Sequence, residues 1–322
     1  KGSAAILMNV NNGEILSLVS LPDFDPNKRK KIIDVNFINR ATKGVYEFGS
    51  VFKTFTIAAA FEEKIIEPNK EFKNLPKYLT CAGFLIREYN ENLPTNLTTE
   101  EILIRSGNIG SVKIAQKIGE EKYKLFLSKL GITEKINFDI EEVGKPLKFN
   151  WGKCPLATAS FGHGITTTLI QIVKAYSIIV NGGFGIKPVL IKPKQKNERK
   201  KIISEEVSEK ILPILRKIVS TKDGTAKLAN VKGYEIGGKT GTANKTVKGV
   251  YVNKKINTFV SIFPTSKPKF ILAVMLDEPE INGEYIYEYR DGSNFKLKGS
   301  PRNTAGWNSV EATGHIVEKI GP

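Results

Sequence analysis

Ser50 and Lys53 are the first residues in this chain whose types and spacing suit covalent chemistry. A serine hydroxyl is a poor nucleophile until a base takes its proton, and a lysine amine serves as that base when burial or a nearby cation lowers its pKa. Three residues apart on a helix, the two side chains share one face within hydrogen-bond reach. Two other Ser-x-x-Lys matches, at 266–269 and 293–296, lie beside Pro268 and in a glycine-bounded loop, so neither offers a helical face.

The alternative for this pair is the ordinary start of a surface helix. Its apolar neighbours argue against that interpretation, because a lysine among them would be removed from water. These neighbours are Phe48, Val51, Phe52 and Phe55. A serine at a helix start also places free backbone N–H groups and the positive end of the helix dipole beside any developing oxyanion.

Two further groups offer polar side chains of the right kind. Ser106 and Asn108 flank Gly107 between two predicted helices, where a hydroxyl and an amide can line a cleft or simply end a helix. The segment 237–243 places Lys239, Thr240 and neighbouring glycines in a predicted strand. Glycine weakens a strand unless another backbone or a ligand approaches closely, so this edge suits a peptide that ends in a carboxylate.

The segment 233–240 also satisfies the Gly-x-x-x-x-Gly-Lys-Ser/Thr pattern of a phosphate-binding loop. In such a loop the Lys-Thr pair opens a helix, whereas the residues after Lys239 have the pattern of a strand and a turn. We therefore prefer the strand interpretation.

The predicted elements that position these groups run in the order strands, helices, strands. The turn signal Asn11-Asn12-Gly13 joins the first two strands into a hairpin. The predicted strands are 4–10, 14–20, 234–243, 256–263 and 269–276. The predicted helices are 50–63, 98–105, 109–118, 121–130, 167–181, one beginning at Ser204, and 309–320. Residues 69–97 and 278–305 are expected to be irregular loops. This order indicates an α+β fold, with an antiparallel sheet built from both chain ends and an inserted helical subdomain at about 64–165.

Composition excludes several classes of protein. The 322 residues are 40% hydrophobic, enough for a sizeable core, and carry a formal net charge of +16. Basic runs at 28–31 and 194–201 lack the interleaved aromatic residues typical of nucleic-acid binding, so no nucleic-acid partner is expected. Two histidines without metal-ligand spacing predict no metal. Cys81 and Cys154 allow at most one disulfide, and the sequence leaves their pairing open.

The three groups in this order resemble the penicillin-recognising serine D,D-transpeptidases and β-lactamases. Further segments resemble the transpeptidase domain of class B penicillin-binding proteins, and the tail 304–308 favours the division-specific, septal branch. These segments are 2–26, 39–42, 46–50, 160–164, 224–226 and 251–254. The resemblance spans essentially all of 1–322. It implies a penicillin-binding, serine β-lactamase-like transpeptidase fold with no cofactor and no metal.

The resemblance also implies a mechanism and a set of site residues. Ser50 would attack the penultimate D-Ala carbonyl of a stem peptide, with Lys53 as base, Ser106 as proton relay and Lys239 keeping Lys53 neutral by like-charge repulsion. The implied substrate-binding residues are Asn108, Thr240, Gly241 and Thr242. The implied oxyanion hole is formed by the backbone N–H groups of Ser50 and Thr242.

An amine of a second stem peptide would then complete the cross-link, and β-lactams would acylate the same serine. The resemblance further implies division-machinery membrane proteins as partners, including a lipid II glycosyltransferase. It places the domain at the periplasmic face of the inner membrane, with a membrane anchor and a pedestal domain upstream of Lys1. Two alternatives remain open: a β-lactamase or D,D-carboxypeptidase that transfers the acyl group to water, and a penicillin-sensing module without turnover.

Overall fold

The computed structural model describes residues 1–25, 27–28, 35–192, 199–247, 249–300 and 302–320. Residues 29–31 and 194–198 of the two basic runs therefore lie outside the described residues. In the part of the chain that is described, no helix combines the length and apolar character needed to cross a bilayer.

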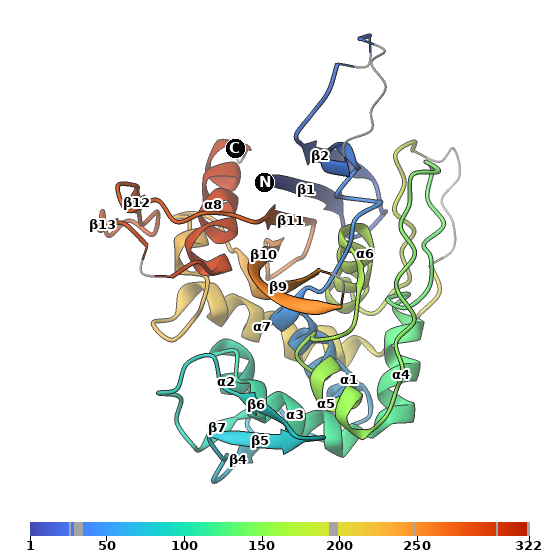
Figure 1. Ribbon diagram of the computed structural model, residues 1–322, viewed down its shortest axis with the longest axis vertical. Helices are drawn as coiled ribbons and strands as arrows, with labels where there is room; N and C mark the ends of the chain where they lie inside the picture. Colours follow the sequence, from blue (N-terminus) through green and yellow to red (C-terminus); the bar gives the residue numbers. More distant parts are fainter. Residues whose placement is uncertain (26, 29–34, 193–198, 248, 301, 321–322) are drawn as a thin grey trace.

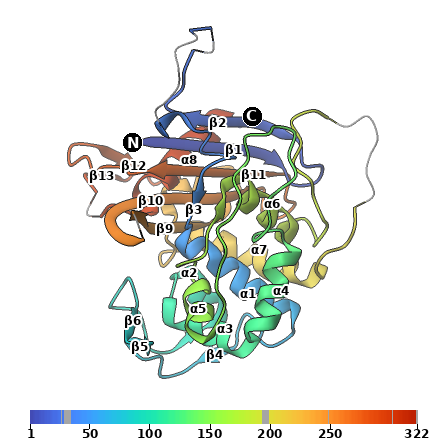
Figure 2. The same cartoon turned by 45° about the vertical axis from the view of Figure 1, so that its right-hand side comes forward.

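A five-stranded antiparallel sheet takes its strands from both ends of the chain, which confirms the predicted α+β architecture (Figure 1). The strands are β1 (Gly2–Asn9), β2 (Ile15–Leu21), β9 (Gly237–Val247), β10 (Val250–Phe263) and β11 (Phe270–Asp277). Their order is β2-β1-β11-β10-β9, so β11 joins the two chain ends and β9 forms one edge. Figure 2 shows this edge facing the helical half of the molecule.

Helices cover both faces of the sheet and build the region beyond its β9 edge. The α-helices are α1 (Phe52–Glu62), α2 (Thr99–Ile104), α3 (Asn108–Ile118), α4 (Glu120–Lys129), α5 (Lys153–Ala159), α6 (Leu169–Val180), α7 (Glu205–Ser220) and α8 (Ser309–Ile320). Helix α8 packs against β10 and β11 on one face, while α6 and α7 contact the sheet from the other (Figure 1). Helix α2, within the predicted helix 98–105, begins with a capping box between Thr98 and Glu101.

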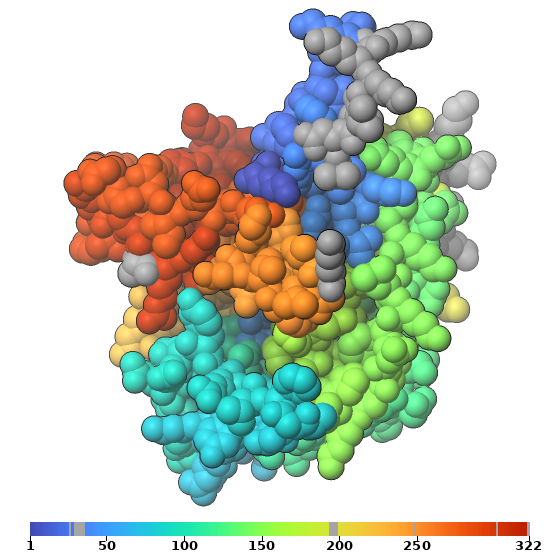
Figure 3. Space-filling view, viewed as in Figure 1, coloured from blue at the N-terminus to red at the C-terminus, as the bar shows by residue number. Residues whose placement is uncertain are grey.

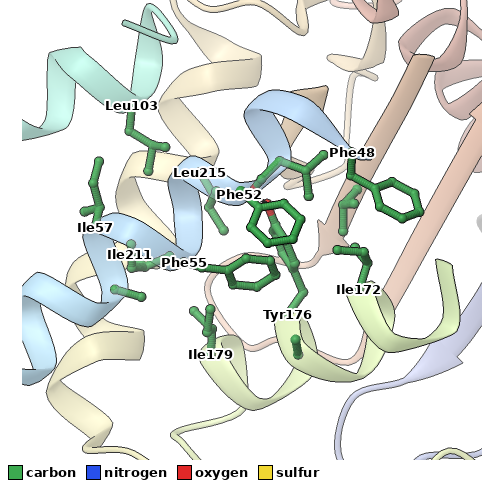
Figure 4. Packing of buried hydrophobic residues seen from close by; sticks show 14 of the residues in the cluster. Phe48, Phe52, Phe55, Ile57, Leu103, Ile172, Tyr176, Ile179, Ile211 and Leu215 are labelled. Carbon is green, nitrogen blue, oxygen red and sulfur yellow. Dashed lines mark hydrogen bonds between the residues drawn. The ribbon is translucent and has the colours of Figure 1, made fainter. Parts of the chain in front are cut away.

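Helix α1 lies in the middle of the hydrophobic core. Every residue from Phe52 to Phe61 is buried, as expected of a helix that is apolar on all sides. Phe55 makes edge-to-face contacts with Phe52 at 5.3 Å and with Tyr176 of α6 at 5.1 Å between ring centroids (Figure 4). The core therefore fixes the helix that carries Lys53 and leaves that side chain with no exposed surface.

The expectation of an irregular loop at 69–97 was wrong. This segment contains β4 (Glu71–Phe72) and a hairpin of β5 (Tyr78–Cys81) and β6 (Phe84–Arg87), and it leads into β7 (Leu97–Thr98), which pairs with β4. The alternation in the hairpin spans only four residues per strand, too few to stand out between proline- and asparagine-rich neighbours. A disulfide joins Cys81 of β5 to Cys154 of α5, and this settles the pairing that the sequence left open.

The remaining elements are short. The segment 278–305, expected to be an irregular loop, holds the paired strands β12 (Ile286–Glu288) and β13 (Lys296–Lys298). Strands β3 (Val45–Tyr46) and β8 (Thr167–Thr168) pair with each other. Among the described residues there are also four 3-10 turns: η1 (Val35–Phe37), η2 (Gly49–Val51), η3 (Lys227–Ala229) and η4 (Ala305–Trp307).

Candidate active site

Ser50 lies in the 3-10 turn η2, which runs directly into α1. Glycines allow this turn to approach the edge strand β9 closely. A Cβ on Gly49, whose φ is +53°, would lie 2.6 Å from the carbonyl oxygen of Thr242, and a Cβ on Gly241 would lie 2.2 Å from that of Phe48. The glycine of the Lys-Thr-Gly segment is therefore required by the contact between β9 and the nucleophile turn.

Lys53 follows in the first turn of α1 and is fully buried. Its Nζ donates to the backbone oxygen of Ser106 and, at 3.1 Å, to the Ser106 hydroxyl. In the part of the chain that is described, the Ser50 hydroxyl makes no hydrogen bond, so the geometry differs from the direct Ser50–Lys53 pair expected from the helical spacing. Packing of α1 in the core directs the Lys53 amine toward Ser106, which lies just before α3.

Ser106 connects the helical side of the site to the sheet. Its backbone has a left-handed φ of +60°, and its hydroxyl also accepts a hydrogen bond from Nζ of Lys239 at 2.9 Å. Lys239 is fully buried and donates a second bond to the carbonyl oxygen of Thr240. Two lysines from separate elements, α1 and β9, thus converge on one hydroxyl.

Burial changes the proton affinity of both amines. Desolvation lowers the pKa of Lys53 to about 7, and the charge of Glu88 opposes part of that effect. Desolvation also lowers the pKa of Lys239, and the charge of Lys53 lowers it further. The principal reason for a neutral Lys53 is therefore burial rather than the repulsion by Lys239 that the sequence analysis expected. Two ammonium groups on one buried hydroxyl are unfavourable, so the pair gives up a proton readily.

The β9 wall presents the two predicted threonines. The Thr240 hydroxyl lies 2.8 Å from that of Thr225, in the Gly-Thr-Ala segment noted in the sequence. The Thr242 hydroxyl oxygen accepts from the backbone N–H of Ala305 at 3.1 Å, which leaves its own proton available as a donor. Threonine donors beside Lys239 suit a carboxylate.

Asn108 is held from outside its own helix. Its side-chain Nδ2 donates to the carbonyl oxygen of Arg87 at 2.7 Å, and its backbone N–H donates to the Glu88 carboxylate at 2.6 Å. Sequence reasoning missed Glu88, because a single acidic residue in a polar segment carries no local signal. The β5–β6 hairpin brings it there.

Ser50, Ser106, Asn108, Thr240 and Thr242 all line one cleft of about 690 Å³. In Figure 3 the hollow lies between the orange surface of β9 and β10 and the cyan surface of the hairpin region. Three further groups of residues line this cleft, and none of them was among the expected site residues: Tyr89, Asn90 and Leu93; Arg302, Thr304 and Trp307; and Glu47 with His163. In the last group the Glu47 carboxylate accepts from the hydroxyl of Tyr251, whose ring stacks on His163.

Such a cleft can perform acyl transfer. A solvent-accessible hydroxyl lies at a helix start, where backbone donors have no partner within the helix. Three residues along the chain is an amine whose pKa is near neutrality. The same cleft also presents a second hydroxyl that bridges two amines and a strand edge whose threonines suit a carboxylate. These are the groups that a nucleophile, its base and a developing oxyanion require.

Comparison with known proteins agrees with this chemistry. Residues 3–294 match the family model described as "Penicillin binding protein transpeptidase domain". The chain is 30% identical to "Probable peptidoglycan D,D-transpeptidase FtsI" of Caulobacter vibrioides, with 100% of this chain and 54% of the relative covered. It is 34% identical to "Stage V sporulation protein D" of Bacillus subtilis, with 87% of this chain and 46% of the relative covered.

The fold is similar to that of the transpeptidase domain of penicillin-binding protein 3 from Burkholderia pseudomallei. That match has a TM-score of 0.81 and 25% identity, and it covers 100% of this chain and 89% of the solved one. The chain thus spans about half the length of these two curated relatives but most of a solved transpeptidase domain.

Proposed function

The chain belongs to the penicillin-binding protein transpeptidase family, and on that premise we propose that it is a serine D,D-transpeptidase that cross-links peptidoglycan stem peptides ending in D-Ala-D-Ala. The observation that carries the proposal is the convergence of Lys53 and Lys239 on the Ser106 hydroxyl, in the cleft that Ser50 lines. That arrangement supplies both the base and the proton relay that an acyl-enzyme needs.

In the first half-reaction Ser50 Oγ attacks the carbonyl carbon of the penultimate D-Ala, and neutral Lys53 takes its proton. The peptide bond to the terminal D-Ala breaks, and the leaving amine receives a proton through Ser106. Thr240 and Thr242, with Lys239, bind the terminal carboxylate, and Asn108 binds the peptide backbone. The backbone N–H groups of Ser50 and Thr242 stabilise the oxyanion, a contribution worth roughly 10²–10³ in rate per donor in other acyl-transfer enzymes.

In the second half-reaction an amine of a neighbouring stem peptide attacks the acyl-enzyme. Its N–H proton returns through Lys53 to Ser50 Oγ as the ester breaks, and an amide cross-link forms. Transfer to water, as in a β-lactamase or D,D-carboxypeptidase, and a penicillin sensor without turnover are the competing outcomes. Relatives named as D,D-transpeptidases favour the amine acceptor.

The wider setting is part of the same proposal. β-Lactams acylate Ser50 as substrate mimics, and the domain acts in septal wall synthesis at the periplasmic face of the inner membrane, joined to a membrane anchor and a pedestal domain. Its partners are division-machinery membrane proteins, including a lipid II glycosyltransferase. Residues 64–165 form the helical subdomain of the transpeptidase unit.

Covalent labelling with fluorescent penicillin, followed by mass mapping of the modified peptide, tests the proposal. We expect the label on Ser50 and its complete loss in Ser50→Ala. Ser266→Ala is the matched control, because Ser266 belongs to another Ser-x-x-Lys match but lies exposed beside β11, and it should label normally. Full labelling of Ser50→Ala would refute the role of Ser50.

Unlabelled wild-type protein is incubated in a separate assay with a D-Ala-D-Ala stem peptide analogue and an amine acceptor. Amide product identifies the transpeptidase, and release of D-Ala with free acid alone identifies transfer to water. A stable penicillin label on Ser50, with no release of D-Ala from the peptide, identifies the sensor.

A further inference from the structure

Helix α3 begins without a side-chain cap of its own. Its N-cap residue is Gly107, which makes no side-chain hydrogen bond, and the first N–H groups of any helix lack partners inside it. The carboxylate of Glu88, twenty residues before Asn108 in the chain, caps the helix instead. Its oxygens accept from the backbone N–H of Asn108 at 2.6 Å and of Ile109 at 2.8 Å. A carboxylate at this position also interacts favourably with the helix dipole.

The neighbouring residue of the same segment holds the Asn108 side chain. The carbonyl oxygen of Arg87 accepts from Asn108 Nδ2 at 2.7 Å. Residues 87 and 88 together therefore fix both the backbone and the side chain of Asn108. Ser106, only two residues away and in a left-handed conformation, receives both lysines. The position of that hydroxyl depends on where the start of α3 is held.

The hairpin that carries Arg87 and Glu88 has few other anchors. Of the eight residues in β5 and β6 only Ile86 is buried, and Phe84 is 78% exposed. The Cys81–Cys154 disulfide ties the hairpin to α5. Just beyond α5, the backbone oxygen of Ser160 accepts from the Thr56 hydroxyl of α1 at 2.7 Å. The hairpin, α5, α1 and α3 are thus connected by a closed series of contacts, and α1 carries Lys53.

We propose that Glu88 is a positioning residue for acylation, which holds the Ser106–Asn108 turn against the two lysines, and that the disulfide fixes the hairpin that carries it. This inference rests on the proposed function, because it concerns the first half-reaction at Ser50. Glu88 touches no reacting atom and acts through Asn108 and Ser106.

The charge of Glu88 gives this role a signature that packing alone would not produce. The charged groups that face Lys53 are Lys239 on β9 and Glu88 on the segment after β6. Burial lowers the pKa of Lys53, and Glu88 raises it. Loss of the Glu88 charge should therefore lower the pKa of Lys53 and move the rise of acylation rate to lower pH.

The test measures the acylation rate by fluorescent penicillin against pH for wild type, Glu88→Gln, Glu88→Asp and Glu91→Gln. Glu91 is the matched control, because it is an exposed glutamate three residues further along the same segment, and its variant should behave as wild type. For Glu88→Gln we expect a plateau lower by about ten- to a hundredfold, as for other small misplacements of catalytic groups, and a midpoint at lower pH. Glu88→Asp keeps the negative charge but has a shorter side chain. We therefore expect the plateau of its acylation rate to fall while the pH midpoint stays near that of wild type.

An unchanged plateau in Glu88→Gln overturns the inference, and so does a lowered plateau with an unchanged midpoint, which indicates a purely structural role. If circular dichroism shows that Glu88→Gln does not fold, the double variant Cys81→Ser/Cys154→Ser provides the test instead. We expect the plateau of its acylation rate to be lower than that of wild type, and an unchanged plateau would refute the inference. Absence of label on wild-type Ser50 contradicts the proposed function instead, so the two failures are distinguishable.

Discussion

At the scale of single residues, burial lowers the pKa of the Lys53 amine, which suits it to accept a proton. An exposed lysine near its ordinary pKa of about 10.4 is almost entirely protonated at neutral pH and cannot accept a proton from a serine. Desolvation in the core lowers the pKa of Lys53 to about 7. A large fraction of molecules then holds a neutral base without any change in the chemistry of the side chain.

The first prediction concerns the pH dependence of acylation. Because neutral Lys53 is the proposed base, the rate constant for penicillin acylation of Ser50 should rise with pH through about 7 and level off above it. Stopped-flow fluorescence with a labelled penicillin measures this profile. A rate independent of pH between 6 and 9 would exclude Lys53 as the titrating base.

The second prediction concerns the cost of burying that amine. Lys53→Met should abolish acylation yet raise the free energy of unfolding by about 1–3 kcal/mol at pH 7, since the desolvation penalty disappears while two hydrogen bonds to Ser106 are lost. The folded pKa lies below the unfolded one, so the penalty is complete below about pH 7 and fades as pH approaches 10.5.

The difference in stability between Lys53→Met and wild type should accordingly shrink with rising pH. Urea unfolding at several pH values measures it. A difference that grows toward high pH would contradict the assigned direction of the pKa shift.

At the scale of elements, η2 and β9 both line the cleft and are in direct contact with each other. Gly241 faces the carbonyl oxygen of Phe48 and the side chain of Val51, with no room for a methyl group. The strand edge proposed to bind substrate therefore packs directly against the turn that carries Ser50, the proposed nucleophile. Movement of either element would change the distance between Ser50 and the two threonines proposed to bind the carboxylate, Thr240 and Thr242.

The third prediction follows from this contact. Gly241→Ala should separate β9 from the turn, lower the acylation rate by at least tenfold and cost about 1–3 kcal/mol of stability, as for other overpacked sites. Gly283→Ala is the control, because a Cβ at Gly283 meets nothing within 4 Å. Penicillin labelling and thermal unfolding of both variants test this, and equal behaviour of the two would contradict it.

At the scale of the whole molecule, one covalent link joins parts of the chain that are 73 residues apart. It connects the hairpin beside the cleft to α5, and through α5 to the buried helix α1. A loop of this length corresponds to about 4 kcal/mol in the chain-entropy description of disulfides, although measured values are often lower.

The fourth prediction is that Cys81→Ser/Cys154→Ser lowers the free energy of unfolding by about 2–4 kcal/mol. Denaturant unfolding measures the difference, and wild type treated with dithiothreitol should show the same loss. Equal free energies of unfolding for the oxidised and the reduced protein would contradict this prediction, because the disulfide would then add no stability to that of the surrounding contacts.

The sequence by itself determined the parts of the protein that have local signals. The Asn-Gly turn, the apolar helix after Ser50, the capping box of α2 and the long C-terminal strands all follow from periodicity and turn chemistry, which act over a few residues. The three polar groups were also visible, because their residue types and order are unusual and resemble a known family.

Only the tertiary structure decided which atoms meet. It directs Lys53 to Ser106, brings Glu88 to the start of α3, pairs the two cysteines, and adds Arg302 and residues 304–307 to the cleft. These contacts join residues from about twenty to more than two hundred positions apart. No local pattern encodes them, because they depend on how the β5–β6 hairpin and the C-terminal segment pack around a core that forms from the whole chain.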